Sequence, residues 1–270
     1  MCHDARMSMT RRGFGVLAAG AAVAAAAPVR AGALLDGLAR LKAAYPGFIA
    51  AVDERFVHWA DGTAMPVSLY PGARPMVEKV RLPDLAAQVI ALYPKGPAPV
   101  PLDPEVDPGR VRYAPFFEKM YGATRAAVAR NLVRVAWPTR ARSGFVEVSR
   151  VNGVDRQLAL VADALAQLPP SFAKFFDAPA GGFVWRPIAG TERLSGHAYG
   201  IAVDINTAQS DYWRDTLKRG EDEARWRNAR PIVSRIPFEV VEAFERHGFI
   251  WGGKWYHYDT MHFEYRPELL

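Results

Sequence analysis

The sequence predicts an α+β fold in which a small antiparallel sheet packs on helices. Half of the 270 residues are hydrophobic, which is enough for one substantial core and indicates one domain or at most two. Segments with helical spacing alternate with short strand-like runs, and the later strand-like runs carry histidines and carboxylates. We therefore expect the sheet to present these polar side chains within residues 141–270, with residues 34 to about 140 as an N-terminal elaboration.

The first 31 residues have the pattern of an export signal. Arg11 and Arg12 precede an apolar run from Val16 to Ala27, which is too short to cross a bilayer as a helix. Paired arginines before such a run are typical of the twin-arginine route, which exports folded proteins. We expect cleavage after Ala31 or Ala33; the alternative interpretation is a buried alanine-rich helix.

Cysteine content and charge restrict the class of protein. The only cysteine, Cys2, lies in the predicted signal, so the processed protein would lack disulfides and would hold any metal through nitrogen and oxygen ligands. Without residues 1–31, 30 basic and 27 acidic side chains remain, and the formal charge falls from +6 to +3. This balance does not favour nucleic-acid binding, and no later apolar stretch approaches the roughly 20 residues of a membrane span.

Each predicted element rests on its residue spacing and on its stop signals. Helical spacing that ends at proline or glycine predicts a helix, and an alternating run bounded by turn residues predicts a strand. Asp61-Gly62 between two extended runs predicts a hairpin within residues 55–70, and the proline-rich residues 95–108 predict a surface segment or linker. The predicted helices are 34–45, 83–94, 116–130, 151–169 and 236–248, and the predicted strands are 131–138, 181–188, 200–206 and 261–266.

One short apolar stretch, LSGHAYGIAVD, places His197 and Asp204 seven positions apart. In a single strand the two side chains would point to opposite faces, because seven is an odd number. They can converge if His197 lies on a loop and Gly200 lets the chain turn before the strand IAVD begins. We expect Ser195 to support the His197 loop by hydrogen bonding rather than to act as a nucleophile, since no base pattern accompanies it.

A second pair of polar residues lies near the C-terminus, where Asp259 precedes His262 by three positions. His197, Asp204 and His262 together would make a three-ligand set with one open position, which is the arrangement of a catalytic zinc site. Asp259 would be a spare carboxylate suited to take a proton from metal-bound water and pass it to a leaving amine. Cobalt, nickel or manganese would also fit such ligands, and hydrogen-bonded structural histidines are the alternative interpretation.

These residues fall in two motifs that resemble a known family. The run S-x-H-x-x-G-x-A-x-D, from Ser195 to Asp204, and the later DTMHFE, from Asp259 to Glu264, resemble the zinc D-alanyl-D-alanine carboxypeptidases and dipeptidases. This family includes phage L-alanyl-D-glutamate endopeptidases and shares a fold with hedgehog signalling domains. The segment WGGKW also resembles the endopeptidase branch, and the resemblance covers roughly residues 150–268.

The resemblance implies roles for particular residues. It makes His197, Asp204 and His262 the zinc ligands and Asp259 the general base. Many family members have glutamate at the position of the base, so the shorter aspartate here favours the endopeptidase-like branch. An arginine upstream of the first histidine holds the substrate carbonyl or carboxylate in this family. Arg186 is the first candidate for this role and Arg193 the second, although a surface ion pair would also explain Arg186.

The resemblance also implies a substrate and a compartment. We expect an exported zinc metallopeptidase that cuts the peptide stem of peptidoglycan in the periplasm, with removal of a terminal D-Ala and cleavage within the stem both open. The alternative is a cell-wall binding module that keeps the zinc without turnover.

Three further features involve aromatic residues or histidine. Tyr212, Trp213 and Trp226 predict a lid or wall over a cleft. The segment from Trp251 to Trp255 predicts either a cleft lining or a turn capped by aromatic residues. His257 is expected to be an exposed loop histidine, and contact with the substrate or the oxyanion is the alternative.

Overall fold

The described part of the chain forms helices and three small antiparallel sheets, which confirms the predicted α+β class. The computed structural model describes residue 1 and residues 26–70, 72–97, 101, 103–139, 144–188, 191–216 and 234–270. The arginine pair and most of the predicted signal therefore lie outside the described residues. Within the described ranges, no helix has the length and apolarity that crossing a membrane requires.

The N-terminal part begins with one long helix and a three-stranded sheet. Helix α1 (Ala26–Ala44) is longer than the predicted helix and ends just before Pro46, and Leu38 and Leu41 on its inner face are fully buried. The sheet has the order β1-β2-β3 and contains the predicted hairpin, whose Gly62 has the positive φ of +85° that the tight turn requires. Its strands are β1 (Ile49–Val52), β2 (Phe56–Trp59) and β3 (Ala64–Pro66).

Four short helices follow, and two predictions about them need correction. Helix α3 stops at Ile90 instead of residue 94, because Ala91 is already extended. The single helix predicted at 116–130 is two helices, because Gly122 at a φ of +121° ends the first and Thr124 caps the second by accepting from the amide of Ala127. These helices are α2 (Met76–Arg81), α3 (Leu85–Ile90), α4 (Ala114–Tyr121) and α5 (Arg125–Ala129).

A hairpin connects the two predicted parts of the chain. Strand β4 (Leu132–Trp137) was predicted, whereas its partner β5 (Gly144–Ser149) was not. The two strands pair along their whole length, so the boundary expected at residue 140 falls inside one sheet. Helix α6 (Val154–Ala166) then packs against both strands, and α7 (Ala173–Phe176) follows.

The C-terminal sheet has the order β6-β8-β7, and helix α9 (Phe238–Glu245) lies between β6 and β7 in the chain. Its strands are β6 (Ala202–Asp204), β7 (Phe249–Trp251) and β8 (His262–Tyr265). The predicted strand at 181–188 is wrong: this segment makes only isolated bridges, Gly181 with Asp204 and Pro187 with Leu194. Pro187 has no amide hydrogen, so it cannot donate to a ladder at its own position.

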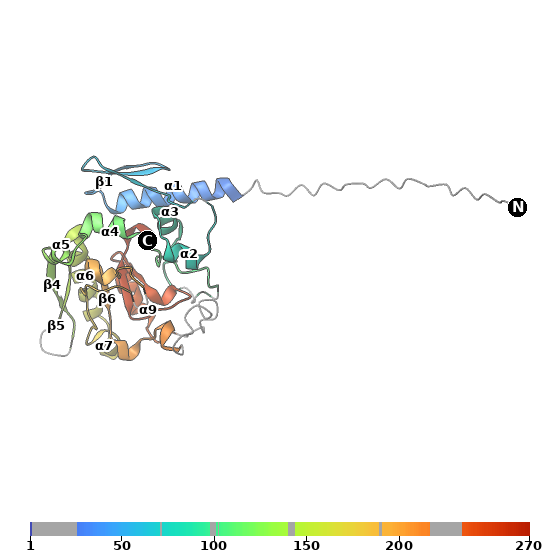
Figure 1. Cartoon of the computed structure of the whole chain (residues 1–270). Coiled ribbons are helices and arrows are strands. Elements are labelled where there is room, and N and C mark those ends of the chain that lie inside the picture. Colours follow the sequence, from blue (N-terminus) through green and yellow to red (C-terminus); the bar gives the residue numbers. More distant parts are fainter. Residues whose placement is uncertain are drawn as a thin grey trace.

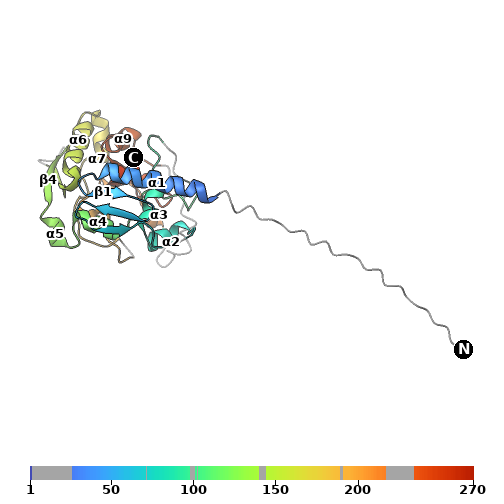
Figure 2. The same ribbon diagram turned by 90° about the horizontal axis from the view of Figure 1, so that it is seen from above.

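Figure 1 shows α1 along one side of the molecule and the C-terminal sheet, in red, within its body, and the turned view of Figure 2 shows the β1-β2-β3 sheet beside α1. One hydrophobic cluster extends from Leu38 in α1 to Leu269 at the C-terminal end, with members from all three sheets. Short 3-10 helices complete the described structure at Val151–Gly153, Pro170–Phe172, Gly196–Tyr199, Thr207–Gln209, Trp213–Thr216, Gly252–Lys254 and Pro267–Leu269.

Candidate metal centre

His197 lies on a tight turn that enters strand β6. It is part of the 3-10 helix Gly196–Tyr199, and the hydroxyl of Ser195 caps this helix by accepting from the amide of His197 at 3.1 Å. Gly200 follows with a φ of +68°, and a Cβ there would lie 2.9 Å from the amide nitrogen of Ser149. The supporting role of Ser195 and the turn at Gly200 agree with the geometry that the sequence required.

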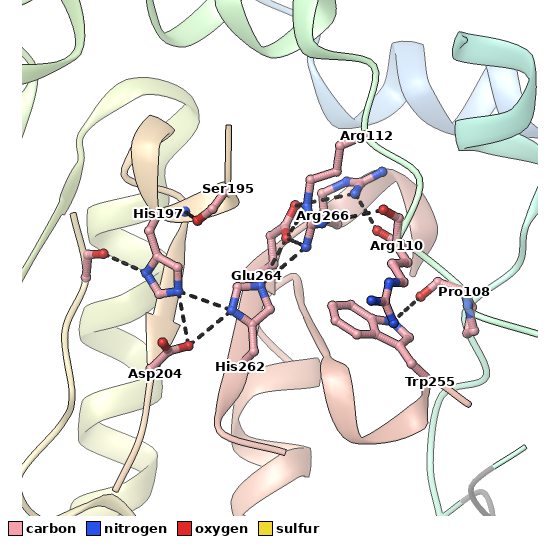
Figure 3. Close-up of polar contacts among 12 residues, drawn as sticks. Pro108, Arg110, Arg112, Ser195, His197, Asp204, Trp255, His262, Glu264 and Arg266 are labelled. Carbon is pink, nitrogen blue, oxygen red and sulfur yellow. Dashed lines mark hydrogen bonds and ion pairs between the residues drawn. The ribbon is translucent and has the colours of Figure 1, made fainter. Parts of the chain in front are cut away.

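Sheet register brings the other two predicted ligands together. Asp204 ends β6 and His262 begins β8, and the two residues face each other as an antiparallel pair. The Oδ1 atom of Asp204 is 3.1 Å from Nε2 of His197 and 3.1 Å from Nδ1 of His262, and the two nitrogens are 3.2 Å apart (Figure 3). Residues separated by 58 and 65 positions therefore form one compact cluster.

The second nitrogen of each imidazole has its own partner. Nδ1 of His197 lies 2.7 Å from the carbonyl oxygen of Gly182, which can only accept, so Nδ1 carries the proton. Nε2 of His262 lies 3.2 Å from the carboxylate of Glu264 and donates in the same way. A neutral imidazole then has its lone pair on the other nitrogen, so Nε2 of His197 and Nδ1 of His262 both face Asp204 as potential ligands.

This cluster needs a positive charge at its centre. Burial disfavours the charged form of His262, but hydrogen bonds to Asp204 and Glu264 outweigh that effect and raise the pKa of His262 to about 9. Asp204 is partly buried, which disfavours its charged form, yet the two histidines hold the pKa of its carboxyl far below the usual range. A proton or a metal cation can therefore occupy the space among these three side chains.

The spacing of the cluster fits a tetrahedral metal. Metal–ligand bonds of about 2.0 Å place neighbouring tetrahedral ligands about 3.3 Å apart, close to the separations of 3.1 to 3.2 Å among the three atoms. The three side chains also line a cavity of about 380 Å³, which leaves room for water and substrate at a fourth position. The donor set, two imidazole nitrogens and one carboxylate oxygen, is that of catalytic rather than structural zinc sites.

Asp259 lines the same cavity on the segment before β8. Its backbone amide donates to the carbonyl of Gly252 at 3.0 Å, whereas its side-chain Oδ1 is buried and has no hydrogen-bond partner among the described residues. Burial raises the pKa of Asp259 to about 6, and the charge of Asp204 contributes in the same direction. A carboxyl group with this pKa can accept and return a proton near neutral pH.

Both arginines predicted from the sequence line the cavity. Arg186 is exposed at the rim, whereas Arg193 is partly buried and no side chain of the described ranges pairs with its guanidinium. Burial and the nearby charges of Arg112 and Arg110 lower the pKa of Arg193 to about 10. An anionic group entering the cavity would relieve this unfavourable environment, so Arg193 is the better placed of the two for binding a carboxylate.

Several cavity residues could not be found from the sequence. Arg110 and Arg112 come from the segment that follows the predicted linker, and no local pattern signals that they reach a site some 150 positions away. The expectation for His257 was wrong: its side chain is fully buried, and Nδ1 lies 2.6 Å from Oδ2 of Asp107, which is also fully buried. A distant carboxylate decides this burial, and neighbouring residues in the sequence carry no sign of it.

The aromatic residues expected near the cleft are partly accounted for. Tyr212 and Trp255 line the cavity, and Trp213 is buried with its ring centroid 4.8 Å from that of His257. Within the described ranges, these residues form part of a wall beside the cavity and not a solvent-exposed lid. Trp226 lies outside the described residues.

The cavity holds a His-Asp-His cluster with an open side, and a further carboxylate with a raised pKa lines the same cavity. Together these groups define a candidate metal-dependent hydrolase centre. Residues 189–265 match the sequence model of the family described as D-alanyl-D-alanine carboxypeptidase. This match confirms the resemblance drawn from the two motifs for that region of the chain. Searches of curated proteins and of solved structures returned no significant match.

The matched region covers part of the site. It includes both histidines, Asp204, Asp259 and Arg193, and it leaves out Arg186 by three residues. Arg110 and Arg112 also lie outside it, although they line the same cavity. The N-terminal part thus supplies cavity residues that the family match does not contain.

Proposed function

We propose that this protein is an exported zinc metallopeptidase that hydrolyses a peptide bond in the stem of peptidoglycan. The convergence of His197, Asp204 and His262 beside an additional carboxylate is the observation that carries this proposal. The family match supports the peptide bond as the target, and the imidazole and carboxylate donors favour zinc. The family's fold, shared with hedgehog domains, is part of the proposal.

Zinc bound by these three side chains would supply a Lewis acid and lower the pKa of a coordinated water toward 7. The protein's own groups would do the rest. Asp259, with its free buried oxygen, would orient the attacking water, take its proton and deliver that proton to the leaving amine. The imidazole hydrogen bonds to Gly182 and Glu264 would keep both rings in the orientation that the metal requires.

An arginine would bind the negative charge of the substrate. Arg193 is the stronger candidate because it is partly buried in the cavity wall and lacks an anionic partner among the described residues. Arg186 at the rim would contact the more distant part of the stem. Both would favour a substrate that presents carboxylates, as the peptidoglycan stem does.

Export by the twin-arginine route and a periplasmic location belong to the same proposal. Arg11 and Arg12, the apolar run that follows them and the absence of cysteine after position 2 support it. Fusing residues 1–40 to a reporter that fluoresces only after folded export tests this directly. Export should stop when both arginines are changed to lysine, and continued export of that variant would contradict the assignment.

Incubating the purified protein with defined muropeptides tests the activity. Mass spectrometry of the products should show new termini that a chelator abolishes and added zinc restores. Loss of one terminal residue would indicate a carboxypeptidase, and two peptide fragments would indicate an endopeptidase. Retention of the muropeptides without cleavage, unchanged in Asp259→Ala, would instead support a zinc-containing binding module.

A further inference from the structure

Segment 106–112, from the N-terminal part of the chain, lies along segment 255–266, which carries the proposed base and the third proposed ligand (Figure 3). Polar contacts recur along the two segments, so their relative position is held at several points. The contacts that hold them are Tyr256 N to Val106 O at 3.2 Å, Trp255 Nε1 to Pro108 O at 2.6 Å, Arg266 Nη1 to Gly109 O at 2.9 Å and Arg110 Nη1 to His257 O at 2.8 Å.

Arg112 lies at the end of this segment with its guanidinium on Glu264. Its Nε donates to the two carboxylate oxygens at 2.8 and 2.6 Å, and its Nη2 also contacts Oε2. Arg112 is 8% exposed and Glu264 is fully buried. Because both side chains are held away from water, the pair keeps one geometry.

Glu264 in turn contacts His262 and the turn that carries His197. Its Oε2 accepts from Nε2 of His262 at 3.2 Å. It also packs on Gly196, the residue before His197, where an added Cβ would lie 2.9 Å from the carboxyl group of Glu264. The position of this carboxylate therefore determines which nitrogen of His262 carries the proton and how closely the His197 turn approaches.

A second arginine on Glu264 provides a comparison. Arg266 reaches Oε1 at 3.4 Å and has its main partner in Glu268 at 2.6 Å. Arg112 alone of these two holds Oε2, the oxygen that faces His262, and its Nη2 is 3.4 Å from that imidazole.

We propose that Arg112 is a positioning residue of the metal centre: it holds the Glu264 carboxylate against Nε2 of His262, so that Nδ1 presents its lone pair to the metal. The proposal rests on the metal-dependent function proposed above. It assigns a role in the site to the N-terminal part of the chain, which lies outside residues 189–265 of the family match. The residue acts through Glu264 and does not touch the metal.

Arg112→Gln and its matched control Arg266→Lys test this assignment in the full-length protein. The measurements are the dissociation constant for Zn²⁺, by competition with a chromophoric chelator, and the ¹⁵N shifts of the His262 ring in the metal-free protein above pH 9, where the imidazole is neutral and the shifts report its tautomer. We expect Arg112→Gln to weaken Zn²⁺ binding roughly 10- to 100-fold and to populate the tautomer with the proton on Nδ1. Arg266→Lys should keep both the affinity and the tautomer of the parent protein.

Glu264→Gln and the double variant Arg112→Gln with Glu264→Gln complete a thermodynamic cycle, and the double variant lacks both buried charges. Because Arg112 acts through the Glu264 carboxylate, we expect Arg112→Gln to weaken Zn²⁺ binding much less in the Glu264→Gln background than in the parent protein. Equal effects of Arg112→Gln in the two backgrounds, or a folded Arg112→Gln with parental affinity and tautomer, would overturn the proposal. Absence of Zn²⁺ binding by the parent protein would instead overturn the proposed function.

Discussion

Asp259 lies in an environment that disfavours the charged form of its carboxyl group. Its side chain is in the cavity wall, Oδ1 has no partner among the described residues, and burial raises its pKa to about 6. A carboxyl group whose pKa is raised in the folded state stabilises the fold fully only below its unfolded pKa of about 3.9, and this contribution is lost as the pH rises through 6. The proposed base is therefore kept at a cost in stability.

Asp259→Asn should separate the catalytic role of this residue from its effect on stability. We expect hydrolysis to fall about 10²- to 10⁴-fold while Zn²⁺ still binds. In the metal-free protein the variant should be more stable above pH 6, by up to about 3 kcal/mol for a shift of about two pKa units, and equal in stability below pH 4. Urea unfolding with chelator at pH 4 and pH 7.5 measures this, and equal stability at both pH values would contradict it.

His262 makes metal binding depend on pH. Its pKa of about 9 means that the metal-free imidazole is protonated at pH 7, because the hydrogen bonds to Asp204 and Glu264 outweigh burial. A metal ligand must lose that proton, so Zn²⁺ binding at pH 7 should release about one proton and weaken about tenfold for each unit that the pH falls below 9. Calorimetric titration in buffers with different ionisation enthalpies measures the released proton, and no release would contradict the predicted protonation.

The two arginines of the cavity should differ in their effect on the reaction. Loss of a charge-assisted hydrogen bond costs about 1.5 to 3 kcal/mol, so Arg193→Met should reduce kcat/KM for a stem peptide about 10- to 100-fold. Arg186→Met, at the exposed rim, should have a smaller effect. The larger loss in Arg186→Met would instead support Arg186, the first candidate from sequence, as the residue that binds the substrate.

At the scale of elements, the turn between the 3-10 helix and β6 determines the site. Gly200 has a φ of +68°, and an added Cβ would approach the backbone of Ser149 to 2.9 Å. Gly62 in the N-terminal hairpin has a similar φ of +85°, but nothing lies within 4 Å of its Cβ position. The two glycines therefore share a backbone requirement and differ in packing.

Gly200→Ala and Gly62→Ala use this difference as a matched pair. Gly62→Ala should cost only the backbone strain, about 1 to 2 kcal/mol, and should leave Zn²⁺ affinity unchanged. Gly200→Ala should cost more and also weaken Zn²⁺ binding, because the His197 turn must move away from Ser149. Denaturant unfolding and chelator competition measure the two effects, and equal behaviour of the two variants would show that the turn does not set the ligand geometry.

At the scale of the whole molecule, the N-terminal and C-terminal parts are joined through buried polar contacts as well as through one core. Tyr45 donates to Glu268 at 2.7 Å, and Lys254 donates to the carbonyl oxygens of Pro94 and Gly96, each at 2.6 Å. Lys254 also pairs with Glu245 at 2.5 Å in a nearly fully buried contact. Residues 34–140 are therefore part of the structure that holds the site.

This organisation predicts cooperative unfolding. The processed protein should unfold in a single transition, and limited proteolysis should not release residues 141–270 as a stable domain, because that fragment would expose core surface and leave Glu264 without Arg112. Two resolved transitions in calorimetry, or a protease-resistant C-terminal fragment, would contradict the prediction.

The local chemistry of the site could be predicted from the sequence. Spacing required His197 to leave the strand before Asp204, and Gly200 is the residue that permits it. The set of His197, Asp204, His262 and Asp259 followed from residue types that suit three metal ligands and a nearby general base. Apolar periodicity likewise located most helices, although it joined α4 and α5 across Gly122 and placed a strand at Pro187.

Tertiary structure decided the contacts that join distant segments. Three such contacts shape the site: the register of β6 with β8, the buried pair of His257 with Asp107, and the ion pair of Arg112 with Glu264. They join residues that lie 58 to 152 positions apart in the sequence. Such pairs leave no periodic or local pattern, because their free energy comes from excluding water around two groups that only the folded chain brings together. The sequence alone thus determined which groups are the candidates for chemistry, and the folded chain decided which groups hold them in place.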